Sequence, residues 1–358
     1  MGETMITLAD IARQYQQDLI HQYQHQFNAT HYQALKALIH CRTPEYGEMQ
    51  YRCTPCHQQQ TFYHSCGHRS CPQCQHQSNS QWLARQQQKL LPVNYFMVTF
   101  TLPYELRSFA WSHQRLVYAT LFDAGIETLN TFAKNDKHLR GKLGMTAVLH
   151  THSRRLEFHP HIHIIVPAGA FNSCQSLWQS KSKKYLFNEF ALAQVFRGKF
   201  LKSIQDPGIK YPMALPKKWV AQCQHVGCGE PALKYLARYL YRGVINESNI
   251  VKFEQGVVTF RYQDSQTKTW EIRTETATDF IWLVLQHVLP KGFRRARDYG
   301  FLHGLAKKTL QRIQLLLKVA ILPLPLKTKN EHLCPCCKKP MDFIPFFKLP
   351  KKFLHNTT

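Results

Sequence analysis

The stretch Phe158-His-Pro-His-Ile-His-Ile-Ile-Val166 decides the expected fold. Its polar and apolar residues alternate, which is the pattern of a β-strand with two different faces. His161 and His163 would share one face, while the apolar residues between and after them would pack into a core on the other. Two imidazoles placed in this way can chelate one divalent cation. The pattern also fits a polar, solvent-facing strand edge that happens to contain histidine.

Further strands are expected on both sides of this one in the sequence. Residues 95–102 alternate in the same way, and residues 145–150 form a hairpin partner across a polar turn at Ser153-Arg-Arg155. Another hairpin is expected around Gln255-Gly256. Because helical segments separate these hairpin-paired strands, we expect an α+β fold with a central antiparallel sheet flanked by helices.

A helix that begins at Pro231 carries two tyrosines, Tyr235 and Tyr239. They are four residues apart, so they share one helix face and their hydroxyls can reach one site. Aromatic residues at this spacing also serve for packing. If the helix lies beside His161 and His163, a tyrosine can attack a phosphodiester whose oxygens a metal polarises. The product would be a 5′-phosphotyrosine, and two tyrosines would allow two such linkages.

The charge of the 358-residue chain indicates a nucleic-acid partner. It has 46 Lys and Arg against 22 Asp and Glu, a net charge of +24. Near the C-terminus, arginines alternate with Phe293, Tyr299 and Phe301, a pattern typical of single-stranded or hairpin DNA binding. The alternative is a solvated loop whose aromatic residues belong to the core. The residues that we expect to contact DNA are Arg238, Lys291, Arg294, Arg295 and Arg297.

The cysteines predict a structural zinc site. Six of the 12 lie between Cys41 and Cys74, and with no secretion signal this clustering favours metal binding over disulfides. Two CxxC pairs can complete a tetrahedral Zn²⁺ site, and we assign Cys53, Cys56, Cys71 and Cys74 to it. Other donors nearby could form a second site or replace one of these four, namely Cys41, Cys66, His57, His64 and His68. The C-terminal Cys334–Cys337 cluster has one CxxC pair, so a complete site there would need His332 or another donor.

Several motifs in order resemble the HUH rolling-circle transposases of bacterial insertion sequences, specifically the insertion-sequence ninety-one family. They are Cys41-Arg-Thr-Pro, the Cys53–Cys74 cysteines, Phe100-Thr-Leu-Pro103, His159-Pro-His-Ile-His163, Tyr235-Leu-Ala-Arg-Tyr239, His287-Val-Leu-Pro-Lys-Gly-Phe293 and Arg297-x-Tyr-Gly-Phe301. The resemblance implies an HUH endonuclease domain, Mg²⁺ or Mn²⁺ on His161 and His163, and Tyr235 and Tyr239 as nucleophiles. It also implies cleavage and strand transfer of single-stranded or hairpin DNA at element ends, and insertion into target DNA.

HUH enzymes usually add a third metal ligand to their two histidines, and His150 and Glu157 are the candidates here. We divide the chain into a helical and zinc-binding stretch (residues 1–91), a nuclease stretch (92–265) and a basic C-terminal stretch (266–358). No apolar run approaches a membrane span, so we expect a cytoplasmic, nucleoid-associated protein with no membrane partner. The alternatives are a plasmid replication initiator or relaxase, and a non-catalytic zinc DNA-binding protein.

Overall fold

The computed structural model describes residues 6–181, 185–205, 214–241, 244–264, 267–320 and 331–345, without the side chains of residues 75–79, 238, 239 and 241. The α-helices of this part are α1 (Leu8–Tyr23), α2 (Ala29–His40), α3 (Pro72–Gln87), α4 (Arg107–Ser112), α5 (Gln114–Asn135), α6 (Glu189–Ile204), α7 (Glu230–Tyr241), α8 (Ala277–Leu285) and α9 (Lys307–Leu316). The strands are β1 (Glu48–Arg52), β2 (Gln59–Tyr63), β3 (Tyr95–Thr101), β4 (Gly144–His152), β5 (Phe158–Pro167), β6 (Gly169–Asn172), β7 (Leu177–Ser180), β8 (Val220–His225), β9 (Ile250–Glu254), β10 (Val257–Gln263), β11 (Trp270–Thr276), β12 (Ala296–Gly300) and β13 (Asp342–Ile344). Within these ranges, every helix is too short or too polar to cross a lipid bilayer.

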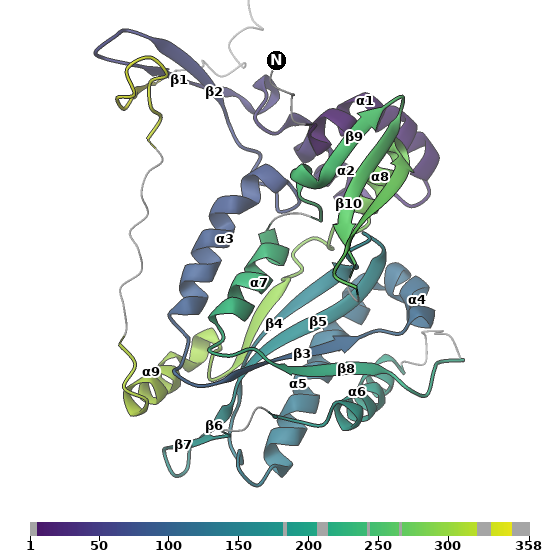
Figure 1. Ribbon diagram of the computed structural model, residues 1–358, viewed down its shortest axis with the longest axis vertical. Helices are drawn as coiled ribbons and strands as arrows, with labels where there is room; N and C mark the ends of the chain where they lie inside the picture. Colours follow the sequence, from purple (N-terminus) through teal and green to yellow (C-terminus); the bar gives the residue numbers. More distant parts are fainter. Residues whose placement is uncertain are drawn as a thin grey trace, which may run out of the picture.

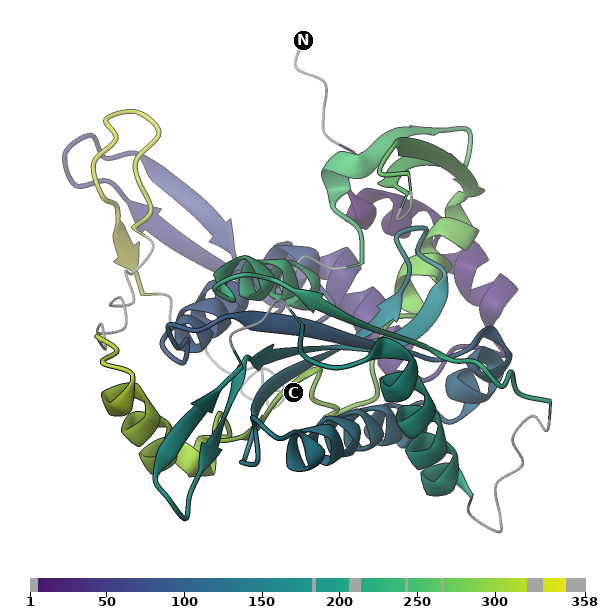
Figure 2. The ribbon, with the colours of Figure 1, turned by 60° about the horizontal axis from the view of Figure 1, so that its bottom comes forward.

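The central sheet has the strand order β12-β4-β5-β3-β8, and every neighbouring pair is antiparallel. Helices α5 and α6 cover one face, and α3 and α7 cover the other (Figures 1 and 2). The expected α+β fold with a central antiparallel sheet and flanking helices is therefore confirmed. The strand with the alternating histidines lies at the middle of this sheet, between β4 and β3.

The side chains of β5 alternate between two cores. Ile162 and Ile164 are fully buried against α5 and α6, in the same cluster as Phe196 of α6. Ile165 faces the other side, where it packs with Leu236 of α7. Because strand residues two apart share a face, the histidines at positions 161 and 163 lie on the α7 side of the sheet. The sequence pattern of this strand thus places its polar residues under α7.

The two N-terminal helices belong to a separate hydrophobic core. Ile11 of α1 and Leu35 of α2 pack with Phe260 of β10 and Phe280 of α8. This core therefore unites parts of all three stretches into which we divided the sequence. Figure 1 shows the resulting lobe, in which β9 and β10 lie beside α1, α2 and α8.

The Gly-Phe part of the Arg297-x-Tyr-Gly-Phe301 motif is explained by packing at the edge of the central sheet. Gly300 ends β12 with φ +61°, and a Cβ atom there would lie 1.6 Å from the carbonyl oxygen of Leu143. Phe301 follows it and is fully buried against Gly144 of β4, where a Cβ would lie 2.3 Å from the ring. Glycine is therefore required at both positions by close approach.

A polar network joins the end of α3 to the edge strand β12. Asp298 of β12 accepts hydrogen bonds from Lys89 Nζ at 2.5 Å, Gln86 Nε2 at 3.0 Å and Thr146 Oγ1 at 2.7 Å. The Asp298→Ala variant would leave these mostly buried donors without their acceptor. We therefore expect its free energy of unfolding to fall by about 1–3 kcal/mol, measured by denaturant titration.

Glu254 provides the matched control for the Asp298 prediction. It forms an ion pair with Lys252 at 2.9 Å, but its side chain is 65% exposed, against 19% for Asp298. Because exposed ion pairs contribute little, Glu254→Ala should change the free energy of unfolding by less than about 1 kcal/mol. Equal losses in the two variants would show that the network does not hold α3 to the sheet.

Candidate active site and metal centres

Three histidines of the central sheet meet on the face that α7 covers. His161 and His163 lie on β5, and His150 lies on β4, where its Cα is paired with that of His161. One nitrogen of each ring lies within 4.8 Å of the others. The other candidate for a third ligand, Glu157, forms an ion pair with Arg155 at 3.7 Å instead. The pairing of the two antiparallel strands thus adds an imidazole, and not a carboxylate, to the expected pair.

Hydrogen bonds orient two of these rings. The Nδ1 atom of His161 lies 2.7 Å from the carbonyl oxygen of His159, and a carbonyl can only accept. Nδ1 therefore carries the hydrogen, and in the neutral ring Nε2 carries the lone pair that binds metals. Nδ1 of His163 is hydrogen-bonded to Thr99 Oγ1 at 2.9 Å. Its Nε2 is therefore likewise the nitrogen that remains available to bind a metal.

Burial keeps the histidines neutral. It lowers the pKa of His161 to about 4, with a further contribution from neighbouring charges. It also lowers the pKa values of His150 and His163 well below the ordinary value. Near pH 7 the rings are therefore unprotonated bases. Three neutral imidazoles converging on one point are a donor set that fits a divalent transition-metal ion.

Helix α7 brings Tyr235 to the histidines. Leu233, Leu236 and Leu240 form its buried stripe, which packs on the sheet. The Tyr235 ring centroid lies 5.9 Å from that of His163 and 6.5 Å from that of His150. Tyr239 lies one turn further along α7, but its side chain is outside the described part of the structure, as is that of Arg238.

A cavity of about 390 Å³ opens beside Tyr235. Its walls come from the turn after β4, the segment before β9 and strands β10 and β11. Trp270 on its wall is 58% exposed, and the Arg261 guanidinium lies 5.0 Å above the Trp270 ring. The cavity thus combines aromatic rings, amides and cationic groups next to Tyr235. Its principal lining residues are Arg154, Tyr235, Asn246, Asn249, Tyr262 and Trp270.

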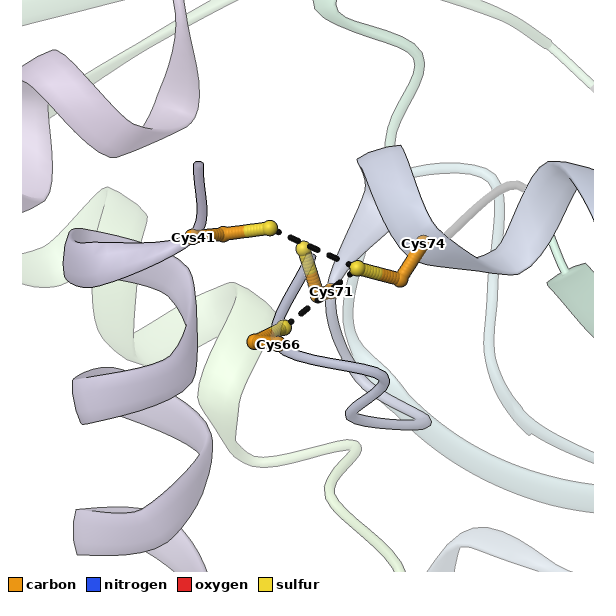
Figure 3. A group of neighbouring side chains, drawn as sticks. All are labelled: Cys41, Cys66, Cys71 and Cys74. Carbon is orange, nitrogen blue, oxygen red and sulfur yellow. Dashed lines mark hydrogen bonds between the residues drawn. The ribbon is translucent and has the colours of Figure 1, made fainter. Parts of the chain in front are cut away.

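A first cysteine cluster lies at the N-terminal end of α3 (Figure 3). Cys41 follows α2, Cys66 lies in the loop after β2, and Cys71 and Cys74 flank the start of α3. Their four sulfurs lie within 4.8 Å of one another, and Cys74 Sγ is 3.4 Å from both Cys41 Sγ and Cys66 Sγ. Four thiols at these separations fit a tetrahedral Zn²⁺ ion.

The assignment of Cys53, Cys56, Cys71 and Cys74 to one zinc site is wrong in its grouping. Cys71 and Cys74 are completed by Cys41 and Cys66, whereas Cys53 and Cys56 lie with Cys334 and Cys337. The physical reason is the β1–β2 hairpin, which carries the Cys53–Cys56 pair away from α3 (Figure 1). His57, His64 and His68 belong to neither group.

Two family models and two curated relatives match the chain. Residues 11–102 match the "Transposase zinc-binding domain" of the IS91 type, and residues 144–309 match a family described as "Putative transposase". The "Putative transposase y4qJ" of Sinorhizobium fredii is 33% identical over 319 residues, which is 82% of this chain and 80% of that protein. The chain belongs to the IS91/IS801-type transposases. A second relative, the "Transposase for insertion sequence element IS801" of Pseudomonas savastanoi pv. phaseolicola, is 27% identical, covering 86% of this transposase and 78% of the relative.

The zinc-binding domain match spans the four ligands of the first cysteine cluster. The family and the cluster together support structural zinc in the transposase. Four thiolates around one ion can stabilise the loop between β2 and α3, which has little apolar core of its own. The ion would also fix the end of α2 to the start of α3.

The aromatic residues near the C-terminal arginines of the transposase belong to the core. Phe293 and Phe301 are buried, so the expectation that they stack on DNA bases is wrong and, as in the alternative, they belong to the core. The residues between them form the strand β12, however, and not a solvated loop. Arg297 packs its guanidinium 4.2 Å from the Phe122 ring centroid. Arg295 donates a hydrogen bond to the carbonyl oxygen of Leu240 at 3.4 Å, near the C-terminal end of α7.

Lys291 and Arg294 of the transposase are exposed on the turn between α8 and β12. The backbone carbonyl of Lys291 accepts a hydrogen bond from Arg115 at 2.6 Å, so the turn is fixed against α5. These two cations are therefore presented to solvent from a fixed position.

Our sequence analysis missed the cavity and its exposed Trp270. A tryptophan on a hairpin in a basic protein is a signal for base stacking, but nothing in the local sequence indicates that this hairpin lies beside Tyr235. It also missed Thr99, whose pairing with His163 becomes visible once β3 and β5 are aligned.

Proposed function

We propose that the transposase nicks and rejoins single-stranded DNA at the ends of its insertion sequence through a 5′-phosphotyrosine intermediate, in a rolling-circle reaction. The central sheet with His161 and His163 would be an HUH-type nuclease domain. The observation that carries this proposal is the position of Tyr235, whose ring lies 5.9 Å from that of His163 in the histidine cluster. A phenol and a metal-binding group this close can act on one phosphate.

His150, His161 and His163 would hold the divalent cation, which when bound polarises the scissile phosphate and stabilises the leaving 3′-oxygen. The Tyr235 hydroxyl attacks the phosphorus, so that a bond from its oxygen to phosphorus forms and the bond from phosphorus to the 3′-oxygen breaks. The phenol gives its proton to solvent, and the 3′-oxygen takes up a proton from solvent and leaves as a hydroxyl, so no net proton is gained or lost. The phosphodiester energy is kept in the tyrosine ester for joining to target DNA.

The donor set favours Mn²⁺ over Mg²⁺ within this proposal. All three ligand atoms are imidazole nitrogens, whereas Mg²⁺ prefers oxygen ligands. Tyr239 would serve as the second nucleophile, and Arg238, Lys291 and Arg294 would bind backbone phosphates. The N-terminal and C-terminal stretches would hold the DNA ends.

The cavity beside Tyr235 supports a single-stranded substrate. An unpaired base next to the cleaved phosphate could enter it and stack on Trp270, whose ring is exposed at its wall. Base–aromatic stacking contributes about 1–3 kcal/mol. Trp270→Ala should therefore raise the DNA concentration needed for half-maximal cleavage about 5- to 100-fold.

Phe190→Ala is the matched control, because this residue is 81% exposed on α6 and does not line the cavity. We expect its cleavage of single-stranded oligonucleotides to equal that of the unsubstituted transposase. If Trp270→Ala behaved like Phe190→Ala, the cavity would not be part of the DNA site.

The proposal is tested with a labelled single-stranded element end and Mn²⁺. We expect a protein–DNA adduct that survives denaturation and does not form in the presence of a chelator. The match to insertion-sequence transposases argues against a plasmid replication initiator or relaxase. A non-catalytic DNA-binding protein would retain the DNA without forming any adduct.

A further inference from the structure

A second cysteine cluster is formed by two CxxC pairs from distant parts of the chain. Cys53 and Cys56 lie in the turn between β1 and β2, and Cys334 and Cys337 lie just before β13. Cys53 Sγ is 3.4 Å from Cys337 Sγ, and Cys56 Sγ is 3.4 Å from Cys334 Sγ. All four sulfurs lie within 4.8 Å of one another. In a tetrahedral zinc–thiolate site the sulfurs are about 3.8 Å apart, so these distances fit.

The two CxxC turns have the same backbone construction although their sequences differ. In the first, Cys53 N donates to the carbonyl oxygen of Gln58 at 2.8 Å, and His57 N donates to that of Cys53 at 2.8 Å. In the second, Cys334 N donates to the carbonyl oxygen five residues later, at position 339, at 2.8 Å, and Lys338 N donates to that of Cys334 at 2.9 Å.

The residue after each pair also has an unusual conformation. His57 has φ 57° and Lys338 has φ 59°, a left-handed backbone that non-glycine residues seldom adopt. Two turns that share this conformation and face each other with their sulfurs form a symmetric set of four ligands. This backbone geometry is independent of the sulfur distances.

The surroundings of this cluster provide little other stabilisation. Its apolar core consists of Cys53, Cys334 and Met341, with Tyr51 and Cys337 partly buried beside them. Strand β13 has three residues and pairs with β1. His332, which we considered as a ligand, instead packs its ring against that of Phe62, with centroids 4.0 Å apart and the ring planes tilted by 38°. Units with so small an apolar core are commonly stabilised by a structural metal or by disulfides.

We propose that the transposase binds a second structural Zn²⁺ ion through Cys53, Cys56, Cys334 and Cys337, which fastens the C-terminal segment to the N-terminal β1–β2 hairpin. The ion closes a loop of more than 270 residues between Cys56 and Cys334. It therefore makes the attachment of residues 331–345 depend on zinc and on reduced thiols. This inference does not rest on the cleavage chemistry proposed above.

The test counts zinc atoms per chain in the purified full-length transposase under reducing conditions. Cys334→Ser with Cys337→Ser should lose one zinc relative to the unsubstituted protein, and Cys53→Ser with Cys56→Ser should lose the same one. The double variant Cys41→Ser, Cys74→Ser should lose the zinc of the first cysteine cluster. A protein that combines this double variant with either of the two others should therefore lose both zinc ions. Cys336→Ser is the matched control, because Cys336 is exposed and is not in the cluster, and it should lose none.

Binding of Co²⁺ to the unsubstituted, metal-free protein keeps the test valid if a variant does not fold. The sulfur-to-cobalt charge-transfer absorption reports thiolate ligands alone and should rise until two equivalents are bound. Saturation at one equivalent would overturn the proposal, as would unchanged zinc content after removal of Cys334 and Cys337.

Discussion

Tyr235→Phe is expected to abolish cleavage of the first strand, with a loss of at least about 10³-fold in the single-turnover rate. The change removes one oxygen and keeps the ring that packs beside His163 at a centroid distance of 5.9 Å. The fold and the metal site should therefore be unaffected. The rate is measured from the covalent adduct formed on a labelled single-stranded end.

Tyr32→Phe controls for the loss of a hydroxyl, because Tyr32 is 44% exposed on α2. It should cleave at the unsubstituted rate. The double variant Tyr235→Phe, Tyr239→Phe should form no adduct at all. An adduct that persisted in the double variant would show that the nucleophile lies elsewhere.

His163→Ala is expected to cause the second large effect, a loss of about 10³-fold in cleavage at fixed Mn²⁺. It removes one of the three imidazoles that would hold the cation, and it also leaves Thr99 Oγ1 without its partner at 2.9 Å. Calorimetric titration with Mn²⁺ should show the corresponding loss of metal affinity.

Thr99→Val gives a graded comparison, because it keeps His163 and removes the group that orients it. We expect metal affinity to fall about 10- to 100-fold, with the cleavage rate recovered at high Mn²⁺. Normal Mn²⁺ affinity in His163→Ala would contradict the assignment of the histidine cluster as the cation site.

The histidine cluster could be predicted from the sequence to a large extent, and the reason is strand geometry. The pairing of His150 with His161 depends on a register shift between His150 and His152, which the turn at Ser153–Arg155 does not predict. The face that His161 and His163 share, in contrast, follows from their alternation along the strand. Local rules of this kind apply before any tertiary contact is known. The helical spacing of the tyrosines likewise indicates a shared face, but not which sheet the helix covers.

The grouping of the cysteines could not be predicted, because sequence spacing does not determine which pairs meet. Each CxxC turn supplies two ligands, and the other two can come from any segment that the fold brings near. Cys71 and Cys74 are completed by Cys41 and Cys66, and Cys53 meets a cysteine more than 270 positions away. Long-range β pairing of β1 with β13 decides this, and three-residue strands give almost no sequence signal.

The arginines near the C-terminus show a similar limit. Their alternation with aromatic residues fits both DNA stacking and a strand at the edge of the core. β12 is such a strand, and the two phenylalanines that flank it, Phe293 and Phe301, are buried in hydrophobic clusters on either side of it.

The most direct test of the account is to locate the DNA on the protein. The adduct formed with a single-stranded element end and Mn²⁺ would be digested with protease and nuclease, and the modified residue identified by mass spectrometry. The account predicts a nucleotide esterified to Tyr235 or Tyr239 of α7, and none when the cation is chelated. A nucleotide on any residue outside α7, or an adduct that forms equally well with chelator present, would contradict it.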